Sequence, residues 1–160
     1  MGACPVTRRK IAALAAAAVT MTTGVTLTTA TPAHAVTCKS PGMFTAAVRT
    51  HSQDIGYQGP RTVTLQLVNI RTSDYSYARL TGAGGTGIQT GDSVWVEWKK
   101  NSSSAWEKCP ATTASHNGVS ALASVGAFNI GHPMRACLSY WATAGYRSTV
   151  CTGSYTDHPE

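Results

Sequence analysis

The sequence has little charge, few aromatic residues and no familiar catalytic signature. Of its 160 residues, 12% are charged and 8% are aromatic. The patterns Gly-x-Ser-x-Gly, His-Glu-x-x-His and the P-loop are missing, which removes the usual signs of serine hydrolases, zinc peptidases and nucleotide hydrolases. No two cysteines have the spacing of about two to four residues that is typical of a zinc knuckle. We therefore expect neither a metal site nor a cofactor.

The chain also lacks a run of about 20 strongly apolar residues that could anchor it in a membrane. Its most apolar stretch, residues 11–27, is interrupted by threonines and a glycine. Basic residues at 8–10 precede that stretch, and Ala-His-Ala at 33–35 matches a signal-peptide cleavage site. We predict a signal peptide over residues 1–35, cleaved after Ala35, and a secreted, extracellular protein. Sec export is favoured, with twin-arginine export as the alternative.

Basic residues form no dense cluster in the remaining chain. The leader holds three of the thirteen basic residues and none of the seven acidic ones. The chain after the leader therefore has ten basic and seven acidic residues, a net charge of +3. Among these later basic residues only Lys99 and Lys100 are adjacent. A nucleic-acid-binding protein usually carries a clustered basic face or stripe. We therefore do not expect nucleic acid as a partner.

Four cysteines follow the leader, an even number that suits disulfide bonding in an exported protein. Four cysteines allow three pairings, and the sequence alone does not select one of them. A final hairpin would place Cys137 opposite Cys151, so we favour that bridge. Cys38 would then pair with Cys109 and tie the start of the mature chain to a central hairpin.

Short segments of alternating apolar and polar residues predict an all-β domain over residues 36–160. We expect an antiparallel β-sandwich or barrel of about six to seven short strands in a single disulfide-stabilised domain. Val68 and Ile70 break the alternation of their segment, which predicts a bulge or a strand end there. The Ala-rich segment 119–125 has a short helix as its alternative. These strands would come from eight candidate segments, namely 62–67, 75–80, 93–99, 105–109, 112–115, 119–125, 134–141 and 146–153.

The segment 93–99 predicts a strand with an aromatic residue on each face. Val94, Val96 and Trp98 share one face, while Trp95, Glu97 and Lys99 share the other. We therefore expect Trp95 to be exposed. Because sugar rings stack on exposed aromatic side chains, Trp95 and Tyr77 are the candidate ligand-binding residues. Packing in the core is the competing explanation for each ring.

Three residues form the best candidate catalytic group. Glu97, His132 and Arg135 have the types that a small secreted ribonuclease would use as base, acid and phosphate clamp. Each has a structural explanation too, because strand and loop surfaces commonly carry such residues. We expect no catalysis from this group, and keep it as the enzymatic alternative.

The segment Gly91 to Trp98, followed by Ala-Trp-Glu-Lys-Cys at 105–109 and by cysteines at 137 and 151, resembles small secreted actinobacterial proteins of uncharacterised function. The resemblance covers about residues 60–153. It implies export and a β-rich fold, and it implies no catalytic residue.

Together these observations predict a secreted, non-catalytic binding protein that acts outside the cell. Its partner would be an envelope component, a polysaccharide or another protein, and we expect the binding protein to be a monomer. One alternative is an inhibitor of an extracellular hydrolase, using an exposed loop at 81–89 or 129–134. The other is a small secreted hydrolase such as a ribonuclease.

Overall fold

The computed structural model describes residues 37–40, 46–55, 61–70, 73–83 and 87–158, which belong to one compact unit, His34–Glu160. The predicted leader lies outside these residues. The described residues form ten strands and no helix, so the prediction of an all-β fold is confirmed. The strands are β1 (Ala46–Ile55), β2 (Arg61–Ile70), β3 (Tyr75–Gly82), β4 (Ser93–Trp98), β5 (Glu107–Lys108), β6 (Thr112–Thr113), β7 (Ala121–Phe128), β8 (Pro133–Thr143), β9 (Tyr146–Cys151) and β10 (Tyr155–Thr156).

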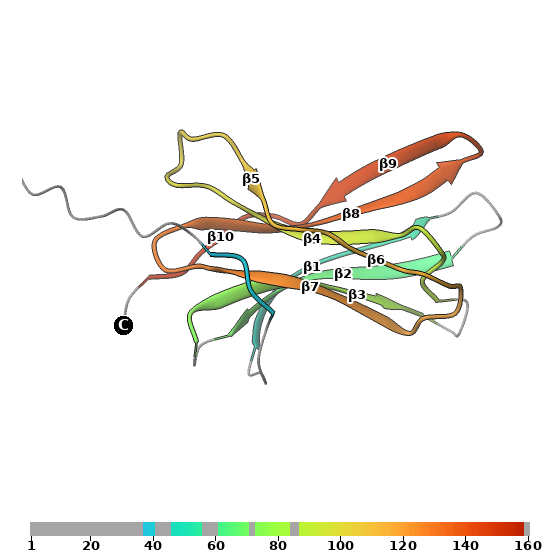
Figure 1. Cartoon of the computed structure of the whole chain (residues 1–160), viewed down its shortest axis with the longest axis horizontal. Coiled ribbons are helices and arrows are strands. Elements are labelled where there is room, and N and C mark those ends of the chain that lie inside the picture. The colour runs from blue at the N-terminus through green and yellow to red at the C-terminus, as the bar shows by residue number, and fades with distance from the viewer. Residues whose placement is uncertain (1–36, 41–45, 56–60, 71–72, 84–86, 159–160) are drawn as a thin grey trace, which may run out of the picture. The chain divides into compact units, whose positions relative to one another are not determined.

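These strands build two layers (Figure 1). The β2 sheet has the order β1-β2-β3-β7. The β8 sheet has the order β10-β8-β4-β5, with β6 also on β4 and β9 also on β8. All pairs between named strands are antiparallel. Because β8 is longer than β4, it continues beyond that partner and forms a projecting hairpin with β9, seen at the upper right of Figure 1.

The hydrophobic core lies between the two sheets and follows the alternation of the strands. Side chains of successive strand residues point to opposite faces, so every second residue faces the core. Burial of this apolar surface, at roughly 25 cal/mol per Å², is the main stabilising contribution to the fold. Core residues with at most 1% exposure include Val63, Leu65 and Leu67 of β2, Ala78 and Leu80 of β3, Val94 and Val96 of β4, and Met134, Ala136 and Leu138 of β8.

A buried ion pair joins the two layers at the start of β2. The side chains of Arg61 and Asp92 are 2% and 0% exposed, and Arg61 donates from Nη1 and Nη2 to the two carboxylate oxygens at 2.5 and 2.9 Å. The backbone N–H of Gln89 donates to the same carboxylate at 3.0 Å. A buried charge without a partner destabilises the folded state, so loss of either side chain would leave the other as an unpaired buried charge.

A second polar network joins the layers at the other end of β2. The Nδ2 group of Asn129 donates to Asn69 Oδ1 and, at 3.1 Å, to Ser76 Oγ. Asn69 Nδ2 in turn donates to Asp157 at 2.8 Å, and the Tyr155 hydroxyl donates to the same carboxylate at 3.1 Å. The network therefore links β2 and β3 to the C-terminal segment around β10.

Two disulfides have the pairing that the sequence analysis favoured. Cys137 and Cys151 face each other across β8 and β9, with their Cα atoms 4.1 Å apart. Cys38 is bonded to Cys109, with a Cα separation of 5.7 Å and a sequence separation of 71 residues. The first bridge fixes the register of the projecting hairpin, and the second ties the N-terminal segment to the strand that returns beside β4.

Two local expectations were wrong. No strand was expected at β1, whose sequence shows no clear alternation, yet it pairs with β2 over ten residues. The predicted interruption at Val68 is absent, because β2 runs unbroken to Ile70 and its last four residues are all buried. The Ala-rich segment forms strand β7, paired with β3, so the expected strand is confirmed and its helical alternative is wrong.

One further expectation, the exposed loop at 81–89, falls partly outside the described residues. Across the described part of the chain, no helix has the length and apolar character needed to cross a membrane.

Candidate functional site

The outer face of the β8 sheet carries charged and aromatic side chains. We define the outer face as the residues of β4 and β8 that alternate with those in the core: Ser93, Trp95, Glu97, Arg135, Cys137 and Ser139. The register places these residues in cross-strand rows. Glu97 lies opposite Arg135, Trp95 opposite Cys137, and Ser93 opposite Ser139. Neighbouring side chains on one face of a sheet interact across the strands, so the rows bring these chemical groups together.

Glu97 is the centre of this face. Its Oε1 accepts a hydrogen bond from the indole Nε1 of Trp95 at 2.8 Å. Its Oε2 accepts from Arg135, at 2.8 Å from Nε and 2.6 Å from Nη2. The Glu97 side chain is 14% exposed and that of Arg135 is 30% exposed. Both carboxylate oxygens are therefore already engaged with groups of the protein.

Three cations lie against the tryptophan rings around Glu97. Lys108 Nζ is 3.7 Å from the centroid of the Trp95 ring. Arg135 and Lys99 both contact the Trp106 ring, with their charged groups 4.1 and 4.8 Å from its centroid. A cation over an aromatic face is attracted by the ring quadrupole, which holds these flexible side chains in place. We call Lys99, Trp106, Arg135, Glu97, Trp95 and Lys108 the cation-tryptophan cluster.

The cation-tryptophan cluster carries an excess of positive charge. Arg135 is the only one of its three cations with a carboxylate partner within 4.0 Å among the described residues. Lys99 donates instead to the backbone oxygen of Ser102, at 3.3 Å, and Lys108 lies over Trp95. The cluster can therefore attract an anionic group without first breaking an ion pair of either lysine.

Trp95 and Tyr77 do not form the exposed sugar-stacking pair that the sequence suggested. Trp95 is 6% exposed and Tyr77 is 3% exposed, so the expectation of an exposed Trp95 was wrong. Lys108, contributed by β5, lies over the Trp95 ring. Tyr77 belongs to β3 in the other sheet and packs with Val68 and Ile70. Burial raises the pKa of the Tyr77 hydroxyl, and the nearby Arg79 charge partly opposes that rise.

The candidate catalytic residues are only partly brought together. Glu97 and Arg135 form an ion pair, as described above. His132 donates from Nδ1 to the carbonyl oxygen of Lys99 at 3.1 Å, and its ring packs edge-on against Trp98 and Phe128. Trp98 packs against the core, on the face of β4 opposite to Glu97. Each described contact of His132 is therefore with residues other than Glu97 and Arg135.

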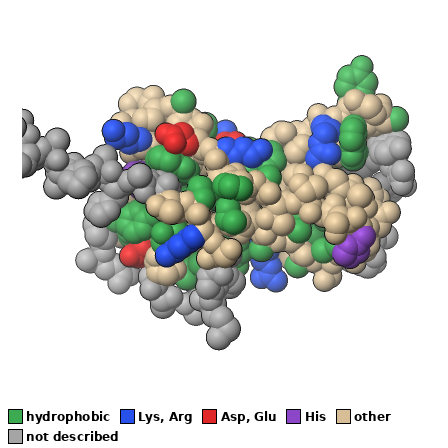
Figure 2. Space-filling model, viewed as in Figure 1, with side chains coloured by type: hydrophobic (Ala, Val, Ile, Leu, Met, Phe, Trp, Pro, Cys, Tyr) green, Lys and Arg blue, Asp and Glu red, His purple; other side chains and the backbone are tan. Residues whose placement is uncertain are grey.

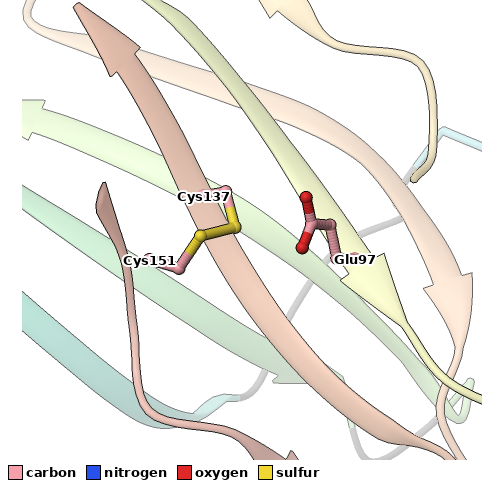
Figure 3. A group of neighbouring side chains, drawn as sticks. All are labelled: Glu97, Cys137 and Cys151. Atoms are coloured by element: carbon pink, nitrogen blue, oxygen red, sulfur yellow. A yellow bond between two sulfur atoms is a disulfide. The ribbon is translucent and has the colours of Figure 1, made fainter. Parts of the chain in front are cut away.

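Glu97 also lies beside the disulfide between Cys137 and Cys151 (Figure 3). One oxygen or sulfur atom from each of these three residues lies within 4.8 Å of the others, a spacing that could suit a metal ion. The two sulfurs are bonded to each other, however, and metal binding by cysteine needs the thiolate. With both Glu97 oxygens also engaged, this group supplies no set of ligands for a metal in the disulfide-bonded protein.

A fourth cation, Arg147, lies farther along the same face and was missed by sequence reasoning. Arg147 of β9 is paired in register with Trp141 of β8, and its guanidinium is 5.0 Å from the centroid of the indole ring. It donates to Ser139 Oγ at 3.0 Å and to the backbone oxygens of Gly91 and Ser139 at 2.6 and 3.0 Å. We call Arg147 and Trp141 the arginine-tryptophan pair. The predicted final hairpin contained the signal, since its register places these two residues opposite each other.

No protein-family model, curated protein or solved structure matches this chain.

Proposed function

We propose that this protein is secreted and acts outside the cell as a non-catalytic binding protein, with the outer face of the β8 sheet as its binding surface. The observation that carries the proposal is the cation-tryptophan cluster. It places three cations and one carboxylate on a sheet face whose opposite side already supplies the hydrophobic core. Two disulfides and the predicted leader support an extracellular site of action.

The contacts of Glu97 favour binding over catalysis. A general base must direct a lone pair at the proton it removes, within hydrogen-bond distance of the substrate. The Glu97 oxygens instead accept from Trp95 and Arg135. His132, the proposed acid, has its contacts with Lys99, Trp98 and Phe128. These arrangements suit a fixed recognition surface better than an acid and base acting on one substrate.

A retention assay tests this proposal. The double substitution Lys99→Gln/Lys108→Gln removes two cations of the cation-tryptophan cluster and breaks no ion pair. The matched control, Arg49→Gln/Arg79→Gln, removes the same charge from exposed residues of the β2 sheet. We expect the wild type and the control to be retained on isolated cell-envelope material, and the lysine variant to be lost.

Two results would contradict the proposal. The first is no retention of the wild type on envelope material together with an empty glycan array. The second is hydrolysis of RNA by the wild type that Glu97→Gln abolishes.

A further inference from the structure

The outer face is longer than the cation-tryptophan cluster alone. Arg135, Cys137, Ser139 and Trp141 follow one another at every second position of β8, so they lie on the same side of that strand. Trp141 lies six positions after Arg135, which corresponds to roughly 20 Å along a strand. The arginine-tryptophan pair therefore lies at the far end of the same face, on the projecting hairpin. Figure 2 shows basic side chains both over the upper sheet and on this hairpin.

The guanidinium of Arg147 is held in a defined position. It lies over Trp141 and donates to Ser139 and to the backbone of Gly91, although Arg147 is exposed. Among the described residues no carboxylate lies within 4.0 Å of it. A cation that is fixed in advance loses little conformational entropy when it binds an anion, which favours recognition.

Hydroxyl groups fill the interval between the two cationic ends. Ser93 lies opposite Ser139 on one side and opposite Thr113 on the other, and the Ser93 and Thr113 hydroxyl oxygens are 2.7 Å apart. Thr149 of β9 extends the same row beyond Ser139. Hydroxyls both donate and accept hydrogen bonds, so this row can exchange hydrogen bonds with a ligand that is itself rich in hydroxyls.

We propose that the ligand of this face is an acidic polysaccharide, bound as an extended chain along β8. This proposal rests on the proposed function and specifies its ligand class. Anionic groups of the polymer would lie against the cation-tryptophan cluster and against Arg147, with sugar hydroxyls on the serine and threonine row between them. Four cations against one carboxylate give the charge complementarity: Lys99, Lys108, Arg135 and Arg147 against Glu97.

The same surface suits other macromolecules less well. Protein interfaces depend on large apolar anchors, and the one exposed large hydrophobic residue in the described chain is Tyr146, at the hairpin tip. Single-stranded nucleic acid needs exposed aromatic rings for its bases, whereas Trp95 is buried and Trp141 is covered by Arg147. Spaced cations separated by hydroxyls match a polymer of sugars with acidic groups.

Binding to matched polymers tests the inference. The probes are dextran sulfate and neutral dextran, which share a backbone, polygalacturonate as a carboxylate polymer, and duplex DNA as an acidic polymer without a sugar-hydroxyl surface. We expect the wild type to bind at least one acidic polysaccharide about tenfold more tightly than dextran or DNA, with affinity falling as salt is added. Arg147→Gln and Lys99→Gln/Lys108→Gln should each weaken that binding about tenfold, and Arg49→Gln/Arg79→Gln should not.

The length of the polysaccharide probe provides a second test. Acidic oligosaccharides too short to reach both ends should bind weakly and respond to only one of the two substitutions, whereas long chains should respond to both. Equal affinity for dextran, equal or tighter binding of DNA, or no binding of any acidic polysaccharide would overturn the inference. If retention on envelope material still depended on Lys99 and Lys108, the proposed function would stand without this ligand class.

Discussion

The two faces of β4 and β8 are built from alternating residues of the same strands, yet they differ completely in chemistry. The inner face is mainly apolar, and Val94, Val96 and Leu138 on it have zero exposure. The outer face carries an ion pair, cations stacked on tryptophan rings and a row of hydroxyls. The inner face already provides the apolar burial that stabilises the sandwich. The fold therefore does not require the ion pair and the cation-tryptophan contacts of the outer face. The difference supports our proposal that the outer face is a recognition surface.

Removing Asp92 should have the largest effect on stability, because it disrupts the interior between the sheets. Asp92→Ala leaves the Arg61 guanidinium buried without its carboxylate. We expect the free energy of unfolding to fall by about 3–5 kcal/mol, measured by urea denaturation. A change below about 1 kcal/mol would show that Arg61 finds water or another partner, contrary to the burial described here.

Substitutions at two adjacent residues of β8 compare how much each face contributes to stability. Leu138→Ala creates a cavity in the core and should lower the free energy of unfolding by about 2–5 kcal/mol. Ser139→Ala, on the outer face, should change it by about 0.5 kcal/mol or less. Both values come from the same denaturation experiment. Equal losses at the two positions would contradict the assignment of the core to one face.

The lysines beside the outer face should affect stability less than Asp92 or Leu138. Lys99→Gln/Lys108→Gln removes two cation and ring contacts near the surface. Such contacts contribute roughly 0.5–1 kcal/mol each, so a loss of about 1–2 kcal/mol in unfolding free energy is the upper bound. A cooperative thermal transition close to that of the wild type is expected. A larger loss would make the cluster a structural element and weaken its interpretation as a binding surface.

Alternation in the sequence predicted the two faces of β4 correctly, and the final hairpin led to the favoured disulfide pairing. Local patterns could not predict contacts made by distant segments. Trp95 is buried, and the β5 return strand brings Lys108 over its ring. The ion pair of Arg61 and Asp92 joins residues 31 positions apart.

The remaining differences have the same physical origin. Strand β1 is an edge strand whose conformation follows from its pairing with β2 rather than from its own pattern. His132 was grouped with Glu97 by residue type, but its ring packs with Trp98 on the other side of the sheet. Residue type and spacing predict which groups are available, whereas the pairing of strands decides which of them meet.

The four tryptophans allow the most direct test of the binding face. Trp95, Trp106 and Trp141 contact cations of the outer face, while Trp98 packs against the core and His132. The measurement is the NMR shift of each indole N–H as dextran sulfate or polygalacturonate oligosaccharide is added. We predict shifts for the three outer-face indoles and none for Trp98. A shift of Trp98 alone, or a bound ligand that leaves the three outer-face signals unchanged, would contradict the account.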